Sequence, residues 1–312
     1  MSGFDFFVDL TITGTVLGLD HTSEREAVHA VFGGGFAEPL DSFGLVEFGW
    51  HEREVVFYGA QAHRLSWLTR ENGVEPALVE RYGDFPDRLD VDDLLKAVAG
   101  QGFPLEEQPC HDDDHVEFRS PVSHMGVLAE RSSRTVEKLL GRSFRPPWRS
   151  FPNQYERFES SVRHLLPLTD VERDAWFDKR EPVENRTDWW GCLAAATARG
   201  TGGAGGAAES ARQRQLLGLA IHRAAVERGV YPPDLAATTE VGLLVGANLA
   251  PDDAVRRWLA TAAMPAPSDL RAARLLRDQI HEVQRALPSL TDPELAAELR
   301  RWGTVKPNLL VD

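Results

Sequence analysis

One stretch constrains the fold more than any other: residues 43–65, FGLVEFGWHEREVVFYGAQAHRL. In its first arm, Val46 and Phe48 share one face at a period of two, which predicts a half-buried β-strand. The second arm begins apolar on both faces at residues 55–58, which favours a central strand. Charged residues 52–54 predict the turn between the two arms. The second strand is expected to run to the end of the stretch, where the polar residues are Gln61, His63 and Arg64.

The segments around this hairpin predict a small α+β domain over residues 1–130, with a mostly antiparallel sheet. Alternation of Phe6, Val8 and Leu10 predicts an opening strand within residues 4–19. Ser23 and Glu26 form a capping-box pattern at the start of a helix, and Asp90 is placed to cap a second helix. Further expected elements are short helices at 66–72 and 76–82 and strands at 115–119 and 125–128.

The rest of the chain is expected to be all-α. The spacing of Val136 and Leu139 indicates a helix in a connecting region over residues 131–199, and Thr169 and Glu172 form a second capping-box pattern in that region. The glycine-rich run at 200–208 is interpreted as a linker, followed by an all-α helical domain over 209–312. Most tryptophans there are expected to pack between helices, and the arginines of residues 270–285 to form a solvated face.

Acidic residues are concentrated in the N-terminal part. Residues 1–130 hold 25 of the 48 Asp and Glu residues but only 8 of the 34 Lys and Arg residues, a net charge of −17, whereas the remaining 182 residues carry +3. A domain this acidic repels nucleic acid and anionic lipid. We therefore expect neither as a partner; the charge fits a basic protein partner or serves solubility alone.

Composition also excludes several classes of protein. Cys110 and Cys192 provide no disulfide framework and no CxxC pair. The longest apolar stretch, near residues 241–250, is far short of the ~20 residues that span a bilayer, and no basic region precedes the first apolar residues. The glycines at 33–35 follow a helix, so they are interpreted as a helix end and not as a phosphate-binding loop. A cytoplasmic protein without a cofactor is expected.

The densest cluster of chemically capable side chains is residues 110–115, CHDDDH. His111, Asp113 and His115 form a possible metal-ligand set, because imidazole and carboxylate groups bind borderline and hard cations. The cluster precedes a strand, however, and a loop with a solvated strand face gives the same pattern. The repeated Cys/His spacing of closed metal sites is missing.

A hydrolytic site would need a histidine beside a carboxylate, and the sequence offers His63 or His51 with Glu47 on the neighbouring strand. The sequence identifies no nucleophile, because it contains no GxSxG motif and neither cysteine stands at a recognisable helix start. We therefore expect no catalytic residue, and binding is favoured over catalysis.

Four segments within residues 14–65 carry a resemblance to known proteins: TGTVLGL, FGGGF, FGLVEFGW and QAHRL. In this order they resemble the N-terminal part of actinobacterial hypothetical proteins that look like immunity proteins of polymorphic toxin systems. The resemblance covers about a sixth of the chain. It implies a non-catalytic inhibitor that binds a toxin.

An acidic inhibitor gains speed and selectivity toward a basic toxin by electrostatic steering. The predicted partner contacts are therefore the acidic groups Glu52, Glu54, Asp112, Asp113, Asp114 and Glu117. Two alternatives stay open from sequence. One is a metal-assisted hydrolase that uses residues 110–115, and the other is an adaptor whose two halves bind different partners.

Overall fold

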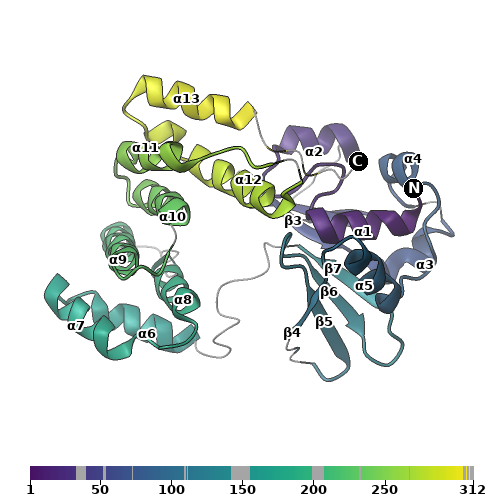
Figure 1. Cartoon of the computed structure of the whole chain (residues 1–312), viewed down its shortest axis with the longest axis horizontal. Helices are drawn as coiled ribbons and strands as arrows, with labels where there is room; N and C mark the ends of the chain where they lie inside the picture. The colour runs from purple at the N-terminus through teal and green to yellow at the C-terminus, as the bar shows by residue number, and fades with distance from the viewer. Residues whose placement is uncertain are drawn as a thin grey trace. The chain divides into compact units, whose positions relative to one another are not determined.

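A computed structural model describes residues 1–32, 40–51, 54–71, 73–108, 110, 112–141, 155–198, 207–231, 233–266, 268–304, 307 and 309 (Figure 1). The chain forms two compact units. Unit 1 comprises Met1–Phe144, Pro265–Leu275 and Pro307–Asp312, and unit 2 comprises Arg145–Met264 and Leu276–Lys306. The sheet lies in unit 1, and the regular elements described in unit 2 are helices. The predicted α+β class, a sheet region followed by a helical region, is confirmed.

Seven described strands form one antiparallel sheet in the order β1-β2-β3-β7-β6-β5-β4. Their bounds are Leu40–Phe43 (β1), Val46–His51 (β2), Glu54–Ala60 (β3), Glu106–Gln108 (β4), His115–Arg119 (β5), Gly126–Glu130 (β6) and Val136–Leu140 (β7). The predicted central hairpin is β2 and β3. Its second strand is shorter than expected, because the chain turns after Ala60 into a 3₁₀ turn, Ala62–Arg64, and helix α3, Leu65–Leu68.

Strand β7 corrects the helix expected around Val136 and Leu139. These two residues are three apart and both are buried, which imitates a helical period. In the ladder with β6, Leu128 pairs with Lys138 but Ala129 pairs with Val136, so Glu137 is an extra residue in a β-bulge. The bulge turns Val136 and Leu139 to the same side. The sheet thus continues past residue 130, where we expected the domain to end.

Helix α1, Gly3–Thr13, corrects the predicted opening strand. The Asp5 carboxylate accepts hydrogen bonds from the amide and hydroxyl of Ser2 at the start of the helix. The helix ends at Gly14, whose φ of 69° suits glycine and whose amide donates to the Leu10 carbonyl. Eight of its eleven residues are buried, around most of its circumference. A helix this enclosed loses its 3.6-residue period, and the alternation of Phe6, Val8 and Leu10 resembles a strand.

Three further helices complete the main framework of unit 1: α2 (Arg25–Phe32), α4 (Pro76–Tyr82) and α5 (Val91–Gly100). The cap predicted at Asp90 is confirmed, because its side chain accepts hydrogen bonds from the amides of Asp92 and Asp93. Helix α1 packs against α4 and α5, and all three contribute to a single core with the inner face of the sheet.

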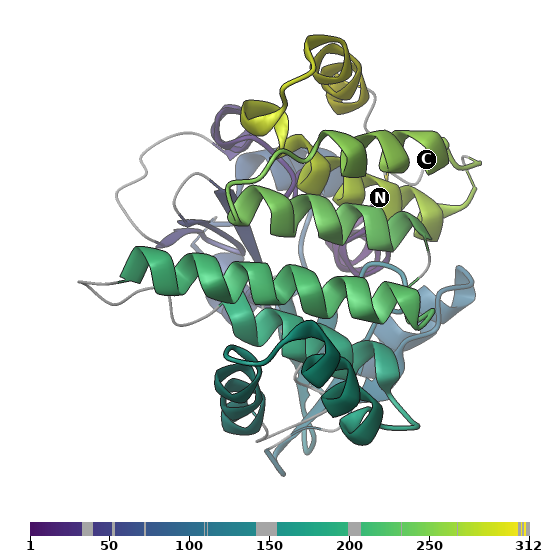
Figure 2. The ribbon, with the colours of Figure 1, turned by 90° about the vertical axis from the view of Figure 1, so that its left-hand side faces the viewer.

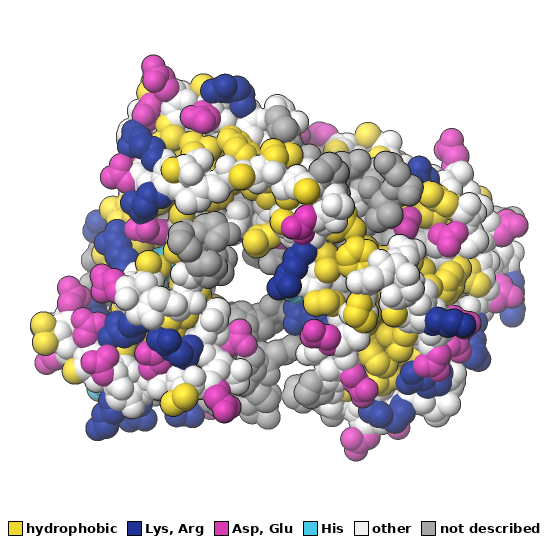
Figure 3. Space-filling model, viewed as in Figure 1, with side chains coloured by type: hydrophobic (Ala, Val, Ile, Leu, Met, Phe, Trp, Pro, Cys, Tyr) yellow, Lys and Arg dark blue, Asp and Glu magenta, His cyan; other side chains and the backbone are white. Residues whose placement is uncertain are grey.

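Unit 2 is built from helices, several of which pack against their neighbours along the chain (Figure 2). Their bounds are Tyr155–Leu165 (α6), Asp170–Arg180 (α7), Arg186–Ala198 (α8), Ala207–Glu227 (α9), Pro233–Gly246 (α10), Asp252–Thr261 (α11), Leu270–Gln284 (α12, which begins in unit 1) and Pro293–Thr304 (α13). The predicted capping box of Thr169 and Glu172 is present at α7. Acidic and basic side chains are interspersed over these helices (Figure 3).

The two helical regions that we expected on either side of a linker share one core. Residues 199–206 lie outside the described residues, but Ala207 already begins α9, and α8 packs along α9. Trp189 and Trp190 are buried in this core together with Leu217 and Ile221 of α9. The packing predicted for these tryptophans is confirmed.

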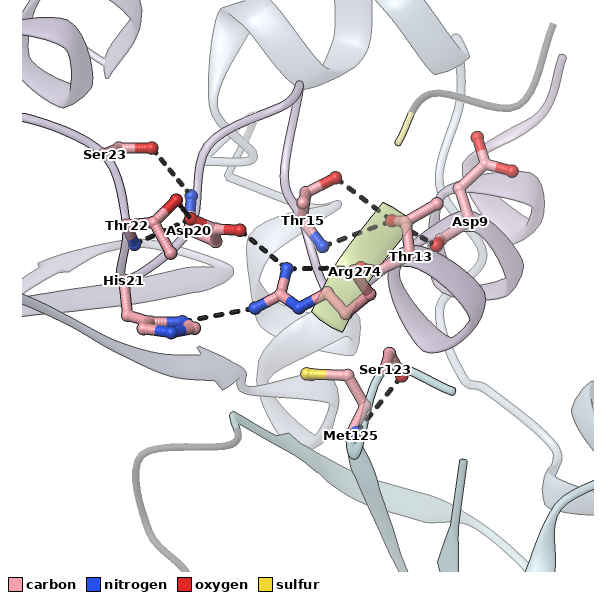
Figure 4. Close-up of polar contacts among 10 residues, drawn as sticks. All are labelled: Asp9, Thr13, Thr15, Asp20, His21, Thr22, Ser23, Ser123, Met125 and Arg274. Atoms are coloured by element: carbon pink, nitrogen blue, oxygen red, sulfur yellow. Dashed lines mark hydrogen bonds and ion pairs between the residues drawn. The ribbon is translucent and has the colours of Figure 1, made fainter. Parts of the chain in front are cut away.

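The solvated arginine face predicted for residues 270–285 is wrong for Arg274 and Arg277, which are 3% and 8% exposed. Within unit 1, Arg274 Nη1 donates to Asp20 Oδ2 at 2.6 Å, and Nη2 lies 3.3 Å from His21 Nδ1 (Figure 4). The other oxygen of Asp20 accepts from the amide and hydroxyl of Thr22. This enclosed ion pair ties residues 265–275 to the N-terminal part of unit 1.

Glu75 is a second buried charge in unit 1, at 7% exposure. One carboxylate oxygen accepts from the amides of Leu45 and Val46, at 3.0 and 2.9 Å, and so fixes the turn before β2. The other oxygen, Oε2, has no hydrogen-bond partner among the described residues. Burial outweighs the backbone hydrogen bonds and raises the pKa of Glu75 to about 7.

This raised pKa predicts a pH-dependent stability. The folded state binds the Glu75 proton more tightly than the unfolded state, so the free energy of unfolding falls as pH rises from about 4.5 to about 7. Glu75→Gln keeps an acceptor for both amides and removes the titration. We expect the variant to be more stable than the native chain by about 3 kcal/mol at pH 8, and by less than about 1 kcal/mol at pH 5. Urea unfolding at both pH values measures this difference; a gap that does not change with pH would contradict the assignment.

Candidate functional site

The bulge in β7 lies beside a concave surface on unit 1, which we call the acidic recess. It encloses about 560 Å³ and is lined by Asp113, Asp114, His115, Glu130, Arg131, Ser132 and Glu137. The sheet register brings these residues together, because His115 of β5 pairs with Glu130 of β6, and β6 pairs with β7 around Glu137. Four carboxylates face one arginine and one histidine in this recess, so its charge is negative.

His115 lies between two carboxylates. Its Nδ1 is 2.7 Å from Asp112 Oδ2 and its Nε2 is 3.1 Å from Glu137 Oε2. The hydrogen bond to Asp112, more than any other contact, raises the pKa of His115 above its ordinary value of 6.5. Since both ring nitrogens hydrogen-bond to carboxylates, the protonated ring connects the loop before β5 to the bulge in β7.

The bulge also explains the position of His63. Nδ1 of this exposed side chain is 3.3 Å from the backbone carbonyl of Glu137, to which it donates. The extra residue of a bulge leaves the regular ladder, and here an imidazole contacts its carbonyl. His63 and His115 therefore both meet Glu137, one at the backbone and one at the side chain.

Arg131 holds the loop before β5 through hydrogen bonds to the loop's backbone. Arg131 donates from Nε to the Asp113 carbonyl at 3.1 Å and from Nη2 to the His115 carbonyl at 3.0 Å. The carboxylates of Asp113 and Asp114 are exposed and make no hydrogen bond or ion pair with the described residues. The loop thus has a fixed backbone and two acidic side chains that are available to a ligand.

Both carboxylate oxygens of Glu130 are held by hydrogen bonds. Its two oxygens accept from the hydroxyls of Ser132 and Ser133, at 2.8 and 2.6 Å. These bonds, with Ser133 the larger contributor, lower the pKa of Glu130. Glu130 therefore stays ionised at neutral pH and adds a fixed negative charge.

Only some of the predicted partner contacts lie at the acidic recess. Asp112, Asp113 and Asp114 lie together at the acidic recess. Glu117 was expected on the solvated face of β5, but its exposure is only 3%. The prediction that Glu117 contacts a partner is therefore wrong. Glu52 lies outside the described residues; Glu54 is the first residue of β3, but its side chain also lies outside them.

The alternative metal set is not assembled by the residues that the structure describes. His111 lies outside them, and nowhere in the described ranges do three His, Cys, Asp or Glu side chains come together as a metal site. His115 and Asp112 bond to each other. The hydrolytic pair of His63 and Glu47 is not formed either, since Glu47 bonds to Gln61 and Arg64.

The arrangement suits binding better than acid–base catalysis. A general base needs a nitrogen that can accept a proton from a substrate, and both nitrogens of His115 already face carboxylates. Converging carboxylates around an open recess instead attract a cation such as a guanidinium or an ammonium group.

Four residues that line the recess were not predicted from the sequence: Glu130, Arg131, Ser132 and Glu137. Glu130 ends β6, Arg131 and Ser132 follow it in the turn, and Glu137 is the bulged residue of β7. The polar run from Glu130 to Arg134 is typical of a turn and could have marked one. Only the strand pairing shows that this turn lies beside the CHDDDH loop.

No family model, no curated protein and no solved structure matches the chain. In the part of the chain that the structure describes, no helix is both long enough and apolar enough to cross a membrane.

Proposed function

We propose that the protein is a non-catalytic binding protein whose acidic recess receives a basic side chain of a protein partner. The observation that carries this proposal is the pair of exposed carboxylates, Asp113 and Asp114, on a loop whose backbone is fixed by Arg131. A preordered acidic site loses little conformational entropy when a cation enters. Arginine fits best, because its planar guanidinium bonds two carboxylates at once.

Two further features support a protein partner. The net charge of −17 on residues 1–130 steers a basic protein toward unit 1 over a Debye length of about 10 Å at 0.1 M salt. Trp67 of α3, which follows His63 by four residues, is 60% exposed. Exposed tryptophans are frequent anchors of protein interfaces.

The proposed class of partner is a basic toxin, and the proposed role is that of an immunity or inhibitor protein. The support is the resemblance of residues 14–65 together with the excess acidity of unit 1. A toxin that acts on nucleic acid must itself tolerate or attract a polyanion, which favours a basic surface. An acidic recess that occupies an arginine of that surface would compete with the nucleic acid.

The proposal is tested with hexa-arginine as a probe for the basic partner. We expect Asp113→Asn with Asp114→Asn to weaken binding by about tenfold at 50 mM NaCl, because two surface ion pairs are lost. The dependence of affinity on salt should also become shallower. The control is Glu24→Gln with Glu26→Gln, which removes two exposed charges elsewhere on unit 1. Isothermal titration calorimetry measures the affinity of each variant for hexa-arginine. Equal losses of affinity in the two variants would mean that only the total charge matters.

The raised pKa of His115 predicts a pH dependence of the same binding. At low pH the protonated ring adds a positive charge to the recess, and above its pKa this charge is lost, which leaves the recess more negative. Affinity for hexa-arginine should therefore rise by about two- to fivefold between pH 6 and pH 9. His115→Gln should remove most of this rise. A rise of the same size in both proteins would show that another group titrates.

A further inference from the structure

Unit 1 contains a second concave surface, which we call the apolar groove. It is bordered by α3, by α4 and by the residues that follow α4, and it has a volume of about 670 Å³. Its apolar lining consists of Leu68, Val74, Pro76, Val79 and Phe85. A cavity of about 150 Å³ holds one benzene molecule, so the groove has room for several apolar side chains.

Part of this apolar lining is in contact with solvent. Leu68 and Val74 are almost fully buried, but Val79 on α4 is 42% exposed. Trp67, which precedes Leu68 in α3, is more exposed still. Apolar surface that is gathered in one place and rimmed by polar residues is typical of a binding site.

The rim of the groove is acidic. Glu80 and Asp84 line it, and none of its described lining residues is a lysine or an arginine. Both carboxylates are exposed and make no hydrogen bond or ion pair with the described residues. A third carboxylate, that of Asp87, lies 2.5 Å from the hydroxyl of Thr69, which also lines the groove. Cationic groups next to apolar side chains would therefore complement this surface.

Three arginines are close to the groove in sequence, but none of them lines it. Arg81 interacts with the carboxylate of Asp9 on α1. Arg88 forms an ion pair with Asp90, at 3.7 Å. Arg70 follows Thr69 and is exposed. The negative charge of the rim is thus available to a partner.

Helix α3 connects the groove to the acidic recess. His63, in the turn before α3, contacts the backbone carbonyl of Glu137 at the recess, and Leu68 at the end of α3 lines the groove. Five residues of helical chain separate His63 from Leu68, a distance of about 8 Å along the axis. One protein partner can therefore reach both surfaces.

We propose that the apolar groove binds a basic amphipathic segment of the protein partner. Apolar side chains of the segment would pack on Val79 and Phe85, and its arginine or lysine side chains would meet Glu80 and Asp84. A helix suits the groove, since apolar residues at i, i+3, i+4 and i+7 share one face. The inference rests on the proposed function, because it assigns a second contact on unit 1 to the same basic partner.

The probe is a peptide with leucine at positions 1, 4, 5 and 8, arginine at positions 2, 6 and 9 and glutamine elsewhere, tested on the full-length chain. A scrambled peptide of the same composition, without an apolar face, is its control. At 150 mM NaCl, where the Debye length is about 8 Å, the amphipathic peptide should bind saturably and about tenfold more tightly than the scrambled one. Glutamate in place of arginine should abolish binding. Isothermal titration calorimetry measures these affinities.

Two variants place the binding on the groove. Val79→Gln should lower the affinity for the amphipathic peptide by about fivefold, because apolar contact is lost. Val31→Gln is the matched control, since Val31 on α2 is similarly exposed but does not line the groove; its effect should stay within about twofold. Glu80→Gln with Asp84→Asn should also weaken binding by about fivefold, because two charges of the rim are lost.

The outcomes separate the groove from the acidic recess. Equal affinity for the amphipathic and scrambled peptides, equal effects of the two valine variants, or tighter binding of the glutamate peptide would overturn the proposal. Asp113→Asn with Asp114→Asn should change the peptide affinity by less than about twofold. A larger loss there than in the Glu80 and Asp84 variant would place the peptide in the recess and overturn the proposal equally. Val79→Gln should bind hexa-arginine as the native chain does, because hexa-arginine has no apolar side chain, so failure of the groove leaves the recess standing.

Discussion

Replacing Asp20 with Asn should lower the free energy of unfolding of unit 1 by about 3–5 kcal/mol, because it leaves the Arg274 guanidinium buried without its carboxylate. Asp20 and Arg274 have side chains that are 0% and 3% exposed and lie 2.6 Å apart. Asn still accepts from Thr22 through its remaining oxygen, so the local turn is kept and only the ion pair is lost. Denaturant unfolding, with amide exchange in β6 and β7 as the reporter of unit 1, measures the change.

The matched control is Glu282→Gln, which breaks the ion pair with Arg285. Both of those side chains are about half exposed, so water screens their charges and the change should be within about 1 kcal/mol. A loss below about 1 kcal/mol for Asp20→Asn would mean that water reaches Arg274 and that the pair does not hold residues 265–275 in place.

Replacing Gly59 with Ala should destabilise unit 1 by at least about 3 kcal/mol. The sheet consists of two antiparallel meanders, β1–β3 and β4–β7, that meet at two register pairs, Gly59 with Leu140 and Ala60 with Leu139. A Cβ atom at Gly59 would lie 1.8 Å from the Leu139 carbonyl oxygen, and the φ of this residue is +118°. Both the overlap and the backbone conformation exclude a side chain at the junction.

Gly100→Ala is the control for this substitution, because a Cβ there has no atom within 4 Å and the residue ends helix α5. Its effect on the free energy of unfolding should be within about 0.5 kcal/mol. The same denaturant experiment compares the two variants. If Gly59→Ala were as mild as Gly100→Ala, the two meanders would not depend on close backbone contact at this point.

The sequence predicted those elements whose pattern is local. The hairpin of β2 and β3, strand β5, the cap at Asp90 and the capping box at Thr169 all follow from side chains within a few residues of one another. The loop of Asp112, Asp113 and Asp114 was also found from its composition alone. Its position before a strand predicted a surface loop, and the three residues are exposed.

The errors arise where burial or pairing changes the expected period. Helix α1 is enclosed on most sides, so its sequence has no polar face to mark a 3.6-residue repeat. In β7, a bulge at Glu137 gives two buried residues a spacing of three, which is typical of a helix. The buried Arg274 was read as solvated because its partner, Asp20, lies 254 positions away in sequence.

Only part of the acidic recess could be predicted for the same reason. Three strands contribute to it, and their pairing depends on the register of β5 with β6 and of β6 with β7. Once Val136 and Leu139 were assigned to a helix, Glu137 could not be placed beside His115. The negative charge of the recess could be predicted from the sequence. Its shape could not, because the shape depends on how the strands pair.

Backbone amide chemical-shift mapping at 50 mM NaCl locates hexa-arginine on the native chain. We expect the largest shifts on residues 113–115, 130–132 and 137, which line the acidic recess. Those shifts should vanish in the variant with Asp113→Asn and Asp114→Asn. Shifts spread evenly over the exposed acidic residues of unit 1, or largest on α2 or α4, would contradict the claim that this recess is the binding site.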